Sequence, residues 1–281
     1  MMTAMTTTLA IANQKGGVAK TTTVASIGAA LAELGHSVLL VDLDPQACLT
    51  FSLGIDPEDL DLSVHHVLTK GLDPTEAMIA TDDGVDLMPA TIELARAEAE
   101  LLTRTGREHV LRAMVEALAE EEVEHDWILL DCPPSLGVLT VAALTAADGV
   151  LVPLQCETLS HRGVGQLLDT VHDVRRFTNR GLEVWGVLPT LYDGRTTHAR
   201  MVLETISETY DLEVVEPPIP KTIKFAEAPA AGRSILATSR TSKGAQAYRE
   251  VAQHLVARSQ RPRAKAPSAK AARSRTGRGG R

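Results

Sequence analysis

The 281-residue sequence contains no apolar run approaching about 18 residues, so we expect no membrane-spanning helix. Its first residues, MMTAMTTTLAIANQ, have neither the basic start nor the cleavage site of a secretory signal, which predicts a cytoplasmic protein. Cysteine is scarce, and Cys48, Cys132 and Cys156 form no C-x-x-C pair. Three widely spaced thiols are typical of reduced, mostly packed side chains and argue against a disulfide framework or a zinc site.

Residues 257–281 lack acids and every bulky apolar or aromatic residue. They carry nine Arg or Lys, namely Arg258, Arg261, Arg263, Lys265, Lys270, Arg273, Arg275, Arg278 and Arg281. Removing nine positive charges from the formal net charge of −8 leaves −17 for residues 1–256. We predict a folded domain over 1–256 and a disordered basic tail over 257–281, since the tail cannot bury enough apolar surface to offset its ordering entropy. Binding to a polyanion and a merely solubilising role remain two interpretations of this tail.

The body of the chain alternates short β-branched runs with amphipathic stretches. The expected strands are Leu9–Ala12, Val38–Val41, Val85–Met88, Trp127–Leu130, Val150–Pro153, Val184–Leu188 and a short one at Glu213–Val215. The expected helices are Thr22–Leu34, Arg107–Glu120, Leu136–Ala146, Arg162–Phe177, Thr197–Thr209 and Ser242–Val256, with Gly35 as the C-terminal cap of the first. Nearly continuous apolar strands between helices predict an α/β fold, a doubly wound and mostly parallel sheet with helices on both faces. Ligands are expected at the carboxyl ends of its strands.

A phosphate-binding loop is predicted at NQKGGVAKTTT, residues 13–23, between the first strand and the first helix. Gly16 and Gly17 allow successive N–H groups to face phosphate oxygens, and the following helix adds its positive end. Lys20 is expected to reach the β- and γ-phosphates, with the Thr21 hydroxyl on Mg²⁺. The expected nucleotide-contacting residues are Lys15, Gly16, Gly17, Val18, Ala19, Lys20, Thr21 and Thr22.

The loop does not fit the common pattern G-x-x-x-x-G-K-[ST], because the required glycines fall on Gln14 and Ala19. It fits x-K-G-G-x-x-K-[ST], the deviant Walker A motif, and so resembles the ParA/MinD-type ATPases. VLLVDLDPQ at 38–46 resembles the switch I segment of that family, where Asp44 would orient the attacking water. DWILLDCPPSLG at 126–137 resembles its Walker B and switch II segments, where Asp131 would hold the hydrated Mg²⁺. The resemblance extends over about residues 7–256.

The resemblance implies a P-loop ATPase that binds ATP and Mg²⁺ and forms a homodimer with ATP. In the family, two subunits sandwich the nucleotides, and a lysine at the position of Lys15 reaches the partner's phosphates. Lys15, Lys20 and Asp44 would therefore be the catalytic residues, with Thr21 and Asp131 as metal ligands. Positions that depart from the family pattern are Ala19, Cys48, Ala142 and Arg162.

Two later segments resemble the chromosome-partitioning branch, ParA or Soj. They are LYDGRTTHARMV at 191–202 and IPKTIKFAEAP at 219–229. The resemblance places Arg195, Lys221 and Lys224 on a DNA-binding face, where cations would contact phosphates without reading bases. It also implies a ParB/Spo0J-type protein that stimulates hydrolysis, non-specific DNA as a partner, and association with the nucleoid.

Other branches of the superfamily remain as alternatives. A MinD-like membrane-cycling ATPase ends in an amphipathic helix that binds membrane. The residues after Val256 are basic but lack bulky apolar side chains, which argues against insertion, although a basic tail can still attract anionic lipid. An ATP-dependent metabolic synthase, as in cobyrinate amidation or dethiobiotin synthesis, shares the P-loop but usually lacks this combination of motifs. Proteins like the nitrogenase iron protein need paired cysteines, and Cys132 stands alone.

Overall fold

The computed structural model describes residues 6–120, 125–157 and 160–261. Seven strands in this part of the chain form one sheet in the order β3-β4-β2-β5-β1-β6-β7. They are β1 (Thr7–Ile11), β2 (Val38–Asp42), β3 (Ile79–Ala80), β4 (Asp86–Met88), β5 (Trp127–Asp131), β6 (Gly149–Gln155) and β7 (Glu183–Thr190). All neighbouring pairs are parallel except β3 and β4. The predicted doubly wound α/β fold is confirmed.

Eleven α-helices lie in the described residues. They are α1 (Lys20–Glu33), α2 (Cys48–Ser52), α3 (Val64–Lys70), α4 (Leu94–Leu101), α5 (Val110–Glu120), α6 (Val138–Ala146), α7 (Ser160–Phe177), α8 (Thr197–Tyr210), α9 (Lys224–Ala230), α10 (Ile235–Thr238) and α11 (Lys243–Ser259). Short 3₁₀ turns lie at Pro57–Asp59, Pro74–Ala77 and Arg107–His109. None of these helices is long and apolar enough to cross a membrane.

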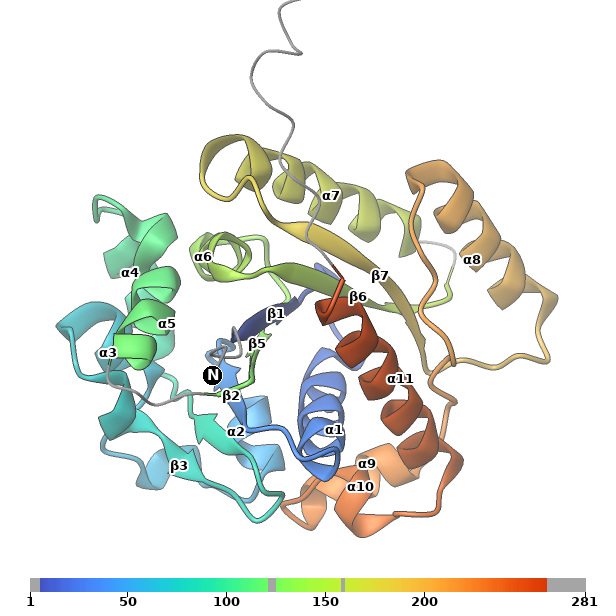
Figure 1. Cartoon of the computed structure of the whole chain (residues 1–281), viewed down its shortest axis with the longest axis horizontal. Coiled ribbons are helices and arrows are strands. Elements are labelled where there is room, and N and C mark those ends of the chain that lie inside the picture. The colour runs from blue at the N-terminus through green and yellow to red at the C-terminus, as the bar shows by residue number, and fades with distance from the viewer. Residues whose placement is uncertain (1–5, 121–124, 158–159, 262–281) are drawn as a thin grey trace, which may run out of the picture.

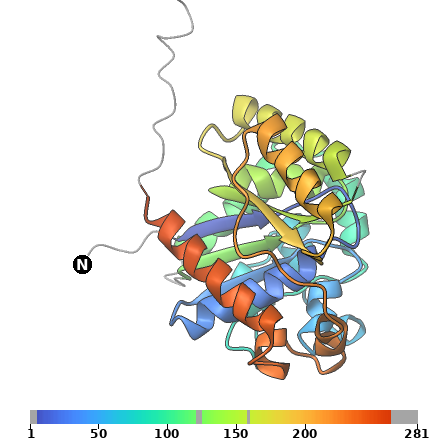
Figure 2. The same ribbon diagram turned by 90° about the vertical axis from the view of Figure 1, so that its right-hand side faces the viewer.

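Two hydrophobic cores enclose the sheet, one on each face. Alternate residues of β1 point to opposite faces, so Leu9 packs among residues of α1 and α11, whereas Ala10 packs among residues of α3 to α7. Helices α1 and α11 lie side by side in both views (Figures 1 and 2). The Tyr248 hydroxyl of α11 lies 3.0 Å from the Thr23 hydroxyl of α1. The last helix therefore supports the helix that begins at the phosphate loop.

A predicted strand and the end of a predicted helix differ from the structure. Residues Glu213–Val215 form no strand: Val214 makes only an isolated bridge to Val187, and the sheet gains the two-residue antiparallel strand β3 at its opposite edge instead. Helix α11 continues to Ser259, beyond the predicted end at Val256. Arg258 therefore belongs to the folded body, where it pairs with Glu213 at 2.7 Å. The remaining tail, residues 262–281, lies outside the described residues.

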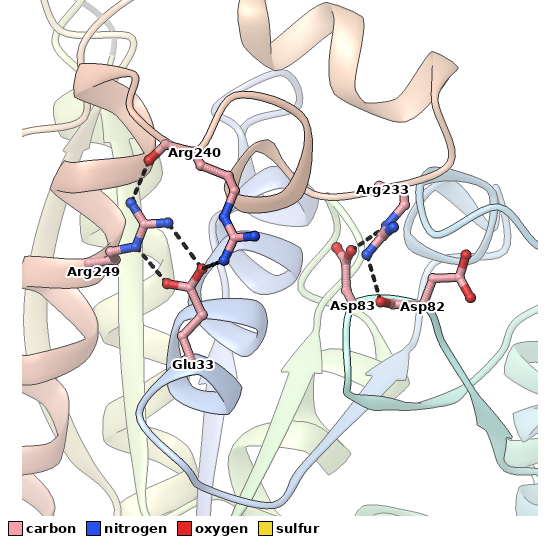
Figure 3. Close-up of polar contacts among 6 residues, drawn as sticks. All are labelled: Glu33, Asp82, Asp83, Arg233, Arg240 and Arg249. Carbon is pink, nitrogen blue, oxygen red and sulfur yellow. Dashed lines mark hydrogen bonds and ion pairs between the residues drawn. The ribbon is translucent and has the colours of Figure 1, made fainter.

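Ion pairs fasten α11 and the turn after α9 to the rest of the body (Figure 3). Arg233 Nε lies 2.8 Å from Asp83 Oδ1 and its Nη2 donates to the Asp82 carbonyl at 2.6 Å, in the turn between β3 and β4. Arg249 donates to both carboxylate oxygens of Glu33 at the end of α1, at 2.5 and 3.0 Å. These contacts fix the turn after α9 (Lys224–Ala230) against the β3–β4 turn, and α11 against the end of α1.

We predict that Gly149→Ala destabilises the fold, because a Cβ at Gly149 would lie 2.3 Å from Trp185 Nε1 in the buried core. The expected loss is about 1–3 kcal/mol of unfolding free energy, measured by urea denaturation. Gly181→Ala is the matched control, since its Cβ would meet only Asn179 Oδ1 at 3.6 Å and should change stability by less than about 0.5 kcal/mol. Equal stability of the two variants would contradict the packing of Trp185 on Gly149.

Candidate active site

The carboxyl ends of four adjacent parallel strands bring the candidate residues together. The phosphate loop follows β1, Asp44 follows β2, Asp131 ends β5 and Glu157 follows β6. In sheet order these strands are β2-β5-β1-β6. The structure thus gathers three motifs at the carboxyl ends of the central strands, where an α/β fold binds its ligands. The motifs are residues 13–23, 38–46 and 126–137.

The phosphate loop turns through two residues with left-handed backbone. Gly17 has φ +74° and Ala19 has φ 64° and ψ 34°. A Cβ added at Gly16 or Gly17 would meet no atom within 4 Å, so the outer side of the loop is open. Ala19, which stands where the family usually has glycine, adopts a conformation that L-residues reach only with strain.

Lys20 is a buried cation at the first residue of α1. Its side chain reaches back over the loop, and Nζ donates to the Lys15 carbonyl at 3.2 Å. Burial lowers the pKa of Lys20, and the carboxylates of Asp131 and Asp44 are among the groups that oppose this shift. An ammonium buried at a helix start gains most from a strong anionic acceptor, and phosphate supplies one.

Asp131 is a buried carboxylate whose two oxygens both lack a hydrogen-bond partner of good geometry. Burial raises its pKa well above the usual range, and Asp42 adds to the rise, while the Thr21 hydroxyl and Lys20 oppose it. An unpartnered buried carboxylate is costly unless a proton or a metal ion compensates it. Hard oxygen ligands from a carboxylate and a hydroxyl are those that Mg²⁺ prefers, so Asp131 and Thr21 fit the predicted metal site.

Asp42, the last residue of β2, bonds the loop that follows this strand and was not singled out in the sequence analysis. Its carboxylate accepts hydrogen bonds from Thr50 N at 2.9 Å, Thr50 Oγ1 at 2.8 Å and Asp44 N at 3.1 Å. Burial raises the pKa of Asp42 to about 6, although these hydrogen bonds oppose the rise. Asp42 therefore holds the loop that carries Asp44. Asp44 itself is half-buried, and its Oδ1 accepts from Gln46 N at 3.0 Å.

Lys15 extends from the loop toward the end of β6. Its Nζ lies 2.5 Å from Glu157 Oε2, and this hydrogen bond lowers the pKa of the Glu157 carboxyl. A cavity of about 480 Å³ opens beside Lys15. It is lined by Asn13, Gln14, Lys15, Pro134, Ser160, Arg162, Gly163 and Gln166. Lys15 thus lies partly exposed at the rim of the site rather than inside it.

The residues predicted for a DNA-binding face lie in two segments that the structure brings together. Arg195 is exposed in the turn between β7 and α8, and Lys221 follows a bridge between Tyr192 and Pro220. Lys221 N donates to the Tyr192 carbonyl at 3.3 Å, which places the two segments side by side. Lys224 is exposed at the start of α9, and its ammonium pairs with Glu227 at 2.8 Å.

The other departures from the family pattern occupy different environments. Cys48 is exposed at the first residue of α2, and all three cysteines are unpaired. Ala142 is fully buried in α6, where it serves packing. Arg162 is exposed in the first turn of α7 and faces the same cavity as Lys15.

Residues 6–184 match the family model of an AAA domain. The sporulation initiation inhibitor protein Soj of Bacillus subtilis (strain 168) is 42% identical over 250 residues, which cover 89% of this chain and 98% of that protein. The chain belongs to the Soj/ParA family. The chromosome-partitioning ATPase Soj of Thermus thermophilus is 44% identical over 260 residues, covering 92% of this chain and 99% of that one.

Among solved structures, this Soj/ParA family member is similar to cobyrinic acid a,c-diamide synthase from Mycobacterium smegmatis with bound ADP and magnesium. The two chains are 57% identical, with a TM-score of 0.79, and the match covers 90% of this chain and 94% of that one.

Two alanines with left-handed backbone lie in the loops of the site, Ala19 before α1 and Ala47 before α2, with φ 64° and 52°. We predict that Ala19→Gly and Ala47→Gly each stabilise the chain by up to about 1 kcal/mol, since the relieved strain exceeds the entropic cost of glycine. Ala113→Gly changes an exposed residue of α5 and should instead destabilise the chain by about 1 kcal/mol. Thermal unfolding measures all three; a loss of stability in both loop variants would contradict the assigned backbone.

Proposed function

We propose that this protein is a Mg²⁺-dependent ATPase switch that dimerises with ATP, binds DNA non-specifically and acts in chromosome or plasmid partitioning. The observation that carries the proposal is the pair of buried ionisable side chains at the carboxyl ends of the strands, Lys20 and Asp131, of which Asp131 has no hydrogen-bond partner of good geometry. Membership in the Soj/ParA family supports it, as does the ADP and magnesium bound to the 57% identical solved structure.

Each site residue at the carboxyl ends of the strands has a proposed role that its position supports. Lys20 and the N–H groups of the loop bind the β- and γ-phosphates. Asp131 and Thr21 would hold Mg²⁺, which when bound would supply positive charge beside the transferred phosphoryl group. Asp44, held by Asp42, orients the attacking water. Lys15 crosses to the phosphates of a second subunit, so hydrolysis depends on dimerisation.

The dimer would present two copies of Arg195, Lys221 and Lys224, and doubling a weak phosphate-binding surface raises its affinity for duplex DNA. A ParB-type partner would stimulate hydrolysis and release the DNA. Contact with DNA would place the protein on the nucleoid.

A second candidate is an ATP-dependent amide synthase, favoured by the name of the 57% identical structure. That reaction consumes ATP only with a carboxylic acid substrate and an amine donor. Incubating the protein with cobyrinic acid, glutamine, ATP and Mg²⁺ tests it. Amide product detected by mass spectrometry would establish the synthase, whereas slow hydrolysis that the acid does not change supports the switch.

We predict that Lys20→Ala lowers ATP affinity by at least about 30-fold, because it removes a charge-assisted contact to the phosphates. Asp44→Ala should bind ATP normally but hydrolyse it at a small fraction of the wild-type rate, since the phosphate contacts remain. Isothermal titration and phosphate release measure the two effects. Lys70→Ala, an exposed lysine at the end of α3, is the control. Normal ATP binding by Lys20→Ala would refute the assignment of the loop.

DNA binding tests the partitioning function directly. We predict that Arg195→Ala removes most of the ATP-dependent gain in affinity for random-sequence duplex and leaves a weak background. Deletion of residues 262–281 should instead flatten the salt dependence with or without ATP, by roughly 0.9 of log–log slope for each phosphate that the tail no longer neutralises. Fluorescence anisotropy across a salt series measures both.

Arg180→Ala is the matched control for Arg195→Ala. Arg180 is also an exposed arginine in a turn, but it lies between α7 and β7, at the amino end of the strand. This variant should keep the full ATP-dependent gain. If Arg195→Ala keeps it too, the DNA face is misplaced. ATP-dependent binding to anionic vesicles, without binding to DNA, would favour the membrane-cycling alternative.

A further inference from the structure

Asn13 is a buried polar residue that none of the assigned roles uses. It lies two residues before Lys15, at the point where the chain leaves β1, and only 3% of its surface is exposed. Its Nδ2 donates to the Pro153 carbonyl of β6 at 2.7 Å, and its Oδ1 accepts from Lys15 N at 3.0 Å. The side chain amide therefore joins the sheet to the phosphate loop.

The first of these contacts continues the ladder between β1 and β6. The last backbone hydrogen bond of that ladder runs from Ala12 N to the Leu151 carbonyl at 3.2 Å. The next acceptor on β6 that faces β1 is the Pro153 carbonyl, and the Asn13 side chain takes the place of a backbone donor there. The backbone of Asn13 is thus free to turn into the loop while its side chain stays bound to the sheet.

The second contact places Lys15. Its N–H is held by Asn13, its carbonyl accepts from Lys20 Nζ, and its own Nζ is paired with Glu157, just beyond β6. The backbone N–H, the carbonyl and the ammonium of Lys15 are therefore all engaged. Asn13 and Glu157 both connect Lys15 to the carboxyl end of β6. Helix α7 approaches closely here, since a Cβ at Gly163 would lie 3.4 Å from Asn13 Oδ1.

We propose that Asn13 is a positioning residue for Lys15: by joining the Lys15 N–H to the Pro153 carbonyl, it sets the point from which the Lys15 side chain crosses to the second subunit. The inference rests on the proposed function, in which Lys15 acts on the partner's nucleotide. Hydrolysis falls steeply when a reacting group is displaced by about 1 Å, so loss of this brace affects catalysis more than nucleotide binding.

The test compares Asn13→Ala with Asn179→Ala. Asn179 has the same kind of bonds, from its Nδ2 to the Leu144 and Ala147 carbonyls at 3.1 and 2.7 Å and from Gly181 N to its Oδ1 at 3.1 Å, but it lies between α7 and β7, away from the loop. Both variants should lower the unfolding temperature. Only Asn13→Ala should lower ATP turnover, by about ten- to a hundred-fold, while its affinity for a fluorescent ATP analogue changes less than about three-fold.

A double-mutant cycle with Lys15→Ala separates positioning from a general effect on the loop. If Asn13 acts through Lys15, Asn13→Ala should reduce turnover little further once Lys15 is gone. Additive losses, or an ATP affinity that falls in step with turnover, would overturn the proposal. If Lys15→Ala alone hydrolyses ATP and dimerises normally, the role of Lys15 in the proposed function fails, which is a different result.

Asn13→Asp, compared with Asn13→Ala, separates the positioning of Lys15 from the stability of the loop. Aspartate keeps the acceptor for the Lys15 N–H but places a carboxylate against the Pro153 carbonyl, so it should be no more stable than the alanine variant. Its turnover should nevertheless be higher, because the hydrogen bond that positions Lys15 is kept. Turnover that follows stability across the two variants would show a merely structural role.

Discussion

Buried charge at the carboxyl ends of a parallel sheet is the constraint on which this structure depends. Asp131 ends a buried strand with no hydrogen-bond partner of good geometry on either carboxylate oxygen, and the ammonium of Lys20 is buried beside the phosphate loop. Isolated buried charges are costly, and the cost falls when an anion and a cation of the right size enter together. The folded chain thus leaves a buried carboxylate without a hydrogen-bond partner at the place where Mg²⁺ and a nucleotide would fit.

The surroundings of these charges make the edge rigid. The Asp42 carboxylate is fully bonded to the loop and to Thr50, and Thr50 Oγ1 in turn accepts from Ala90 N at 3.0 Å. Asp42 and Asp131 are partners in adjacent strands, since β2 and β5 pair in register at these residues. One carboxylate is therefore committed to structure while its neighbour is left open for a ligand.

Much of the fold could be predicted from the sequence because the buried strands are continuous apolar runs. Strands β1, β2, β5 and β6 lie within two residues of their expected bounds at nearly every end. The two-residue strand β3 and the five-residue helix α2 are too short for periodicity to indicate. Glu213–Val215 has the composition of a strand, but only Val214 bridges to β7.

The candidate site also contains residues that the sequence indicates and residues that only the structure reveals. Lys20, Thr21 and Asp131 come together as their motifs indicate, because each motif stands next to a strand end. Glu157 and Asn13 were missed, since their partners are distant in the sequence: Glu157 meets Lys15 and Asn13 meets Pro153 only once β6 lies beside β1. A single sequence carries no local signal for such contacts.

The central place of β1 has a consequence for the order in which the chain can fold during synthesis. Thr7 pairs with Trp127 and Leu9 pairs with Gly149, so both neighbours of the first strand are made long after it. At translation rates of about 5–20 residues per second, roughly seven to thirty seconds pass before β6 exists to receive β1. The phosphate loop, although near the start of the chain, therefore cannot take its final shape until more than half of the domain has been made.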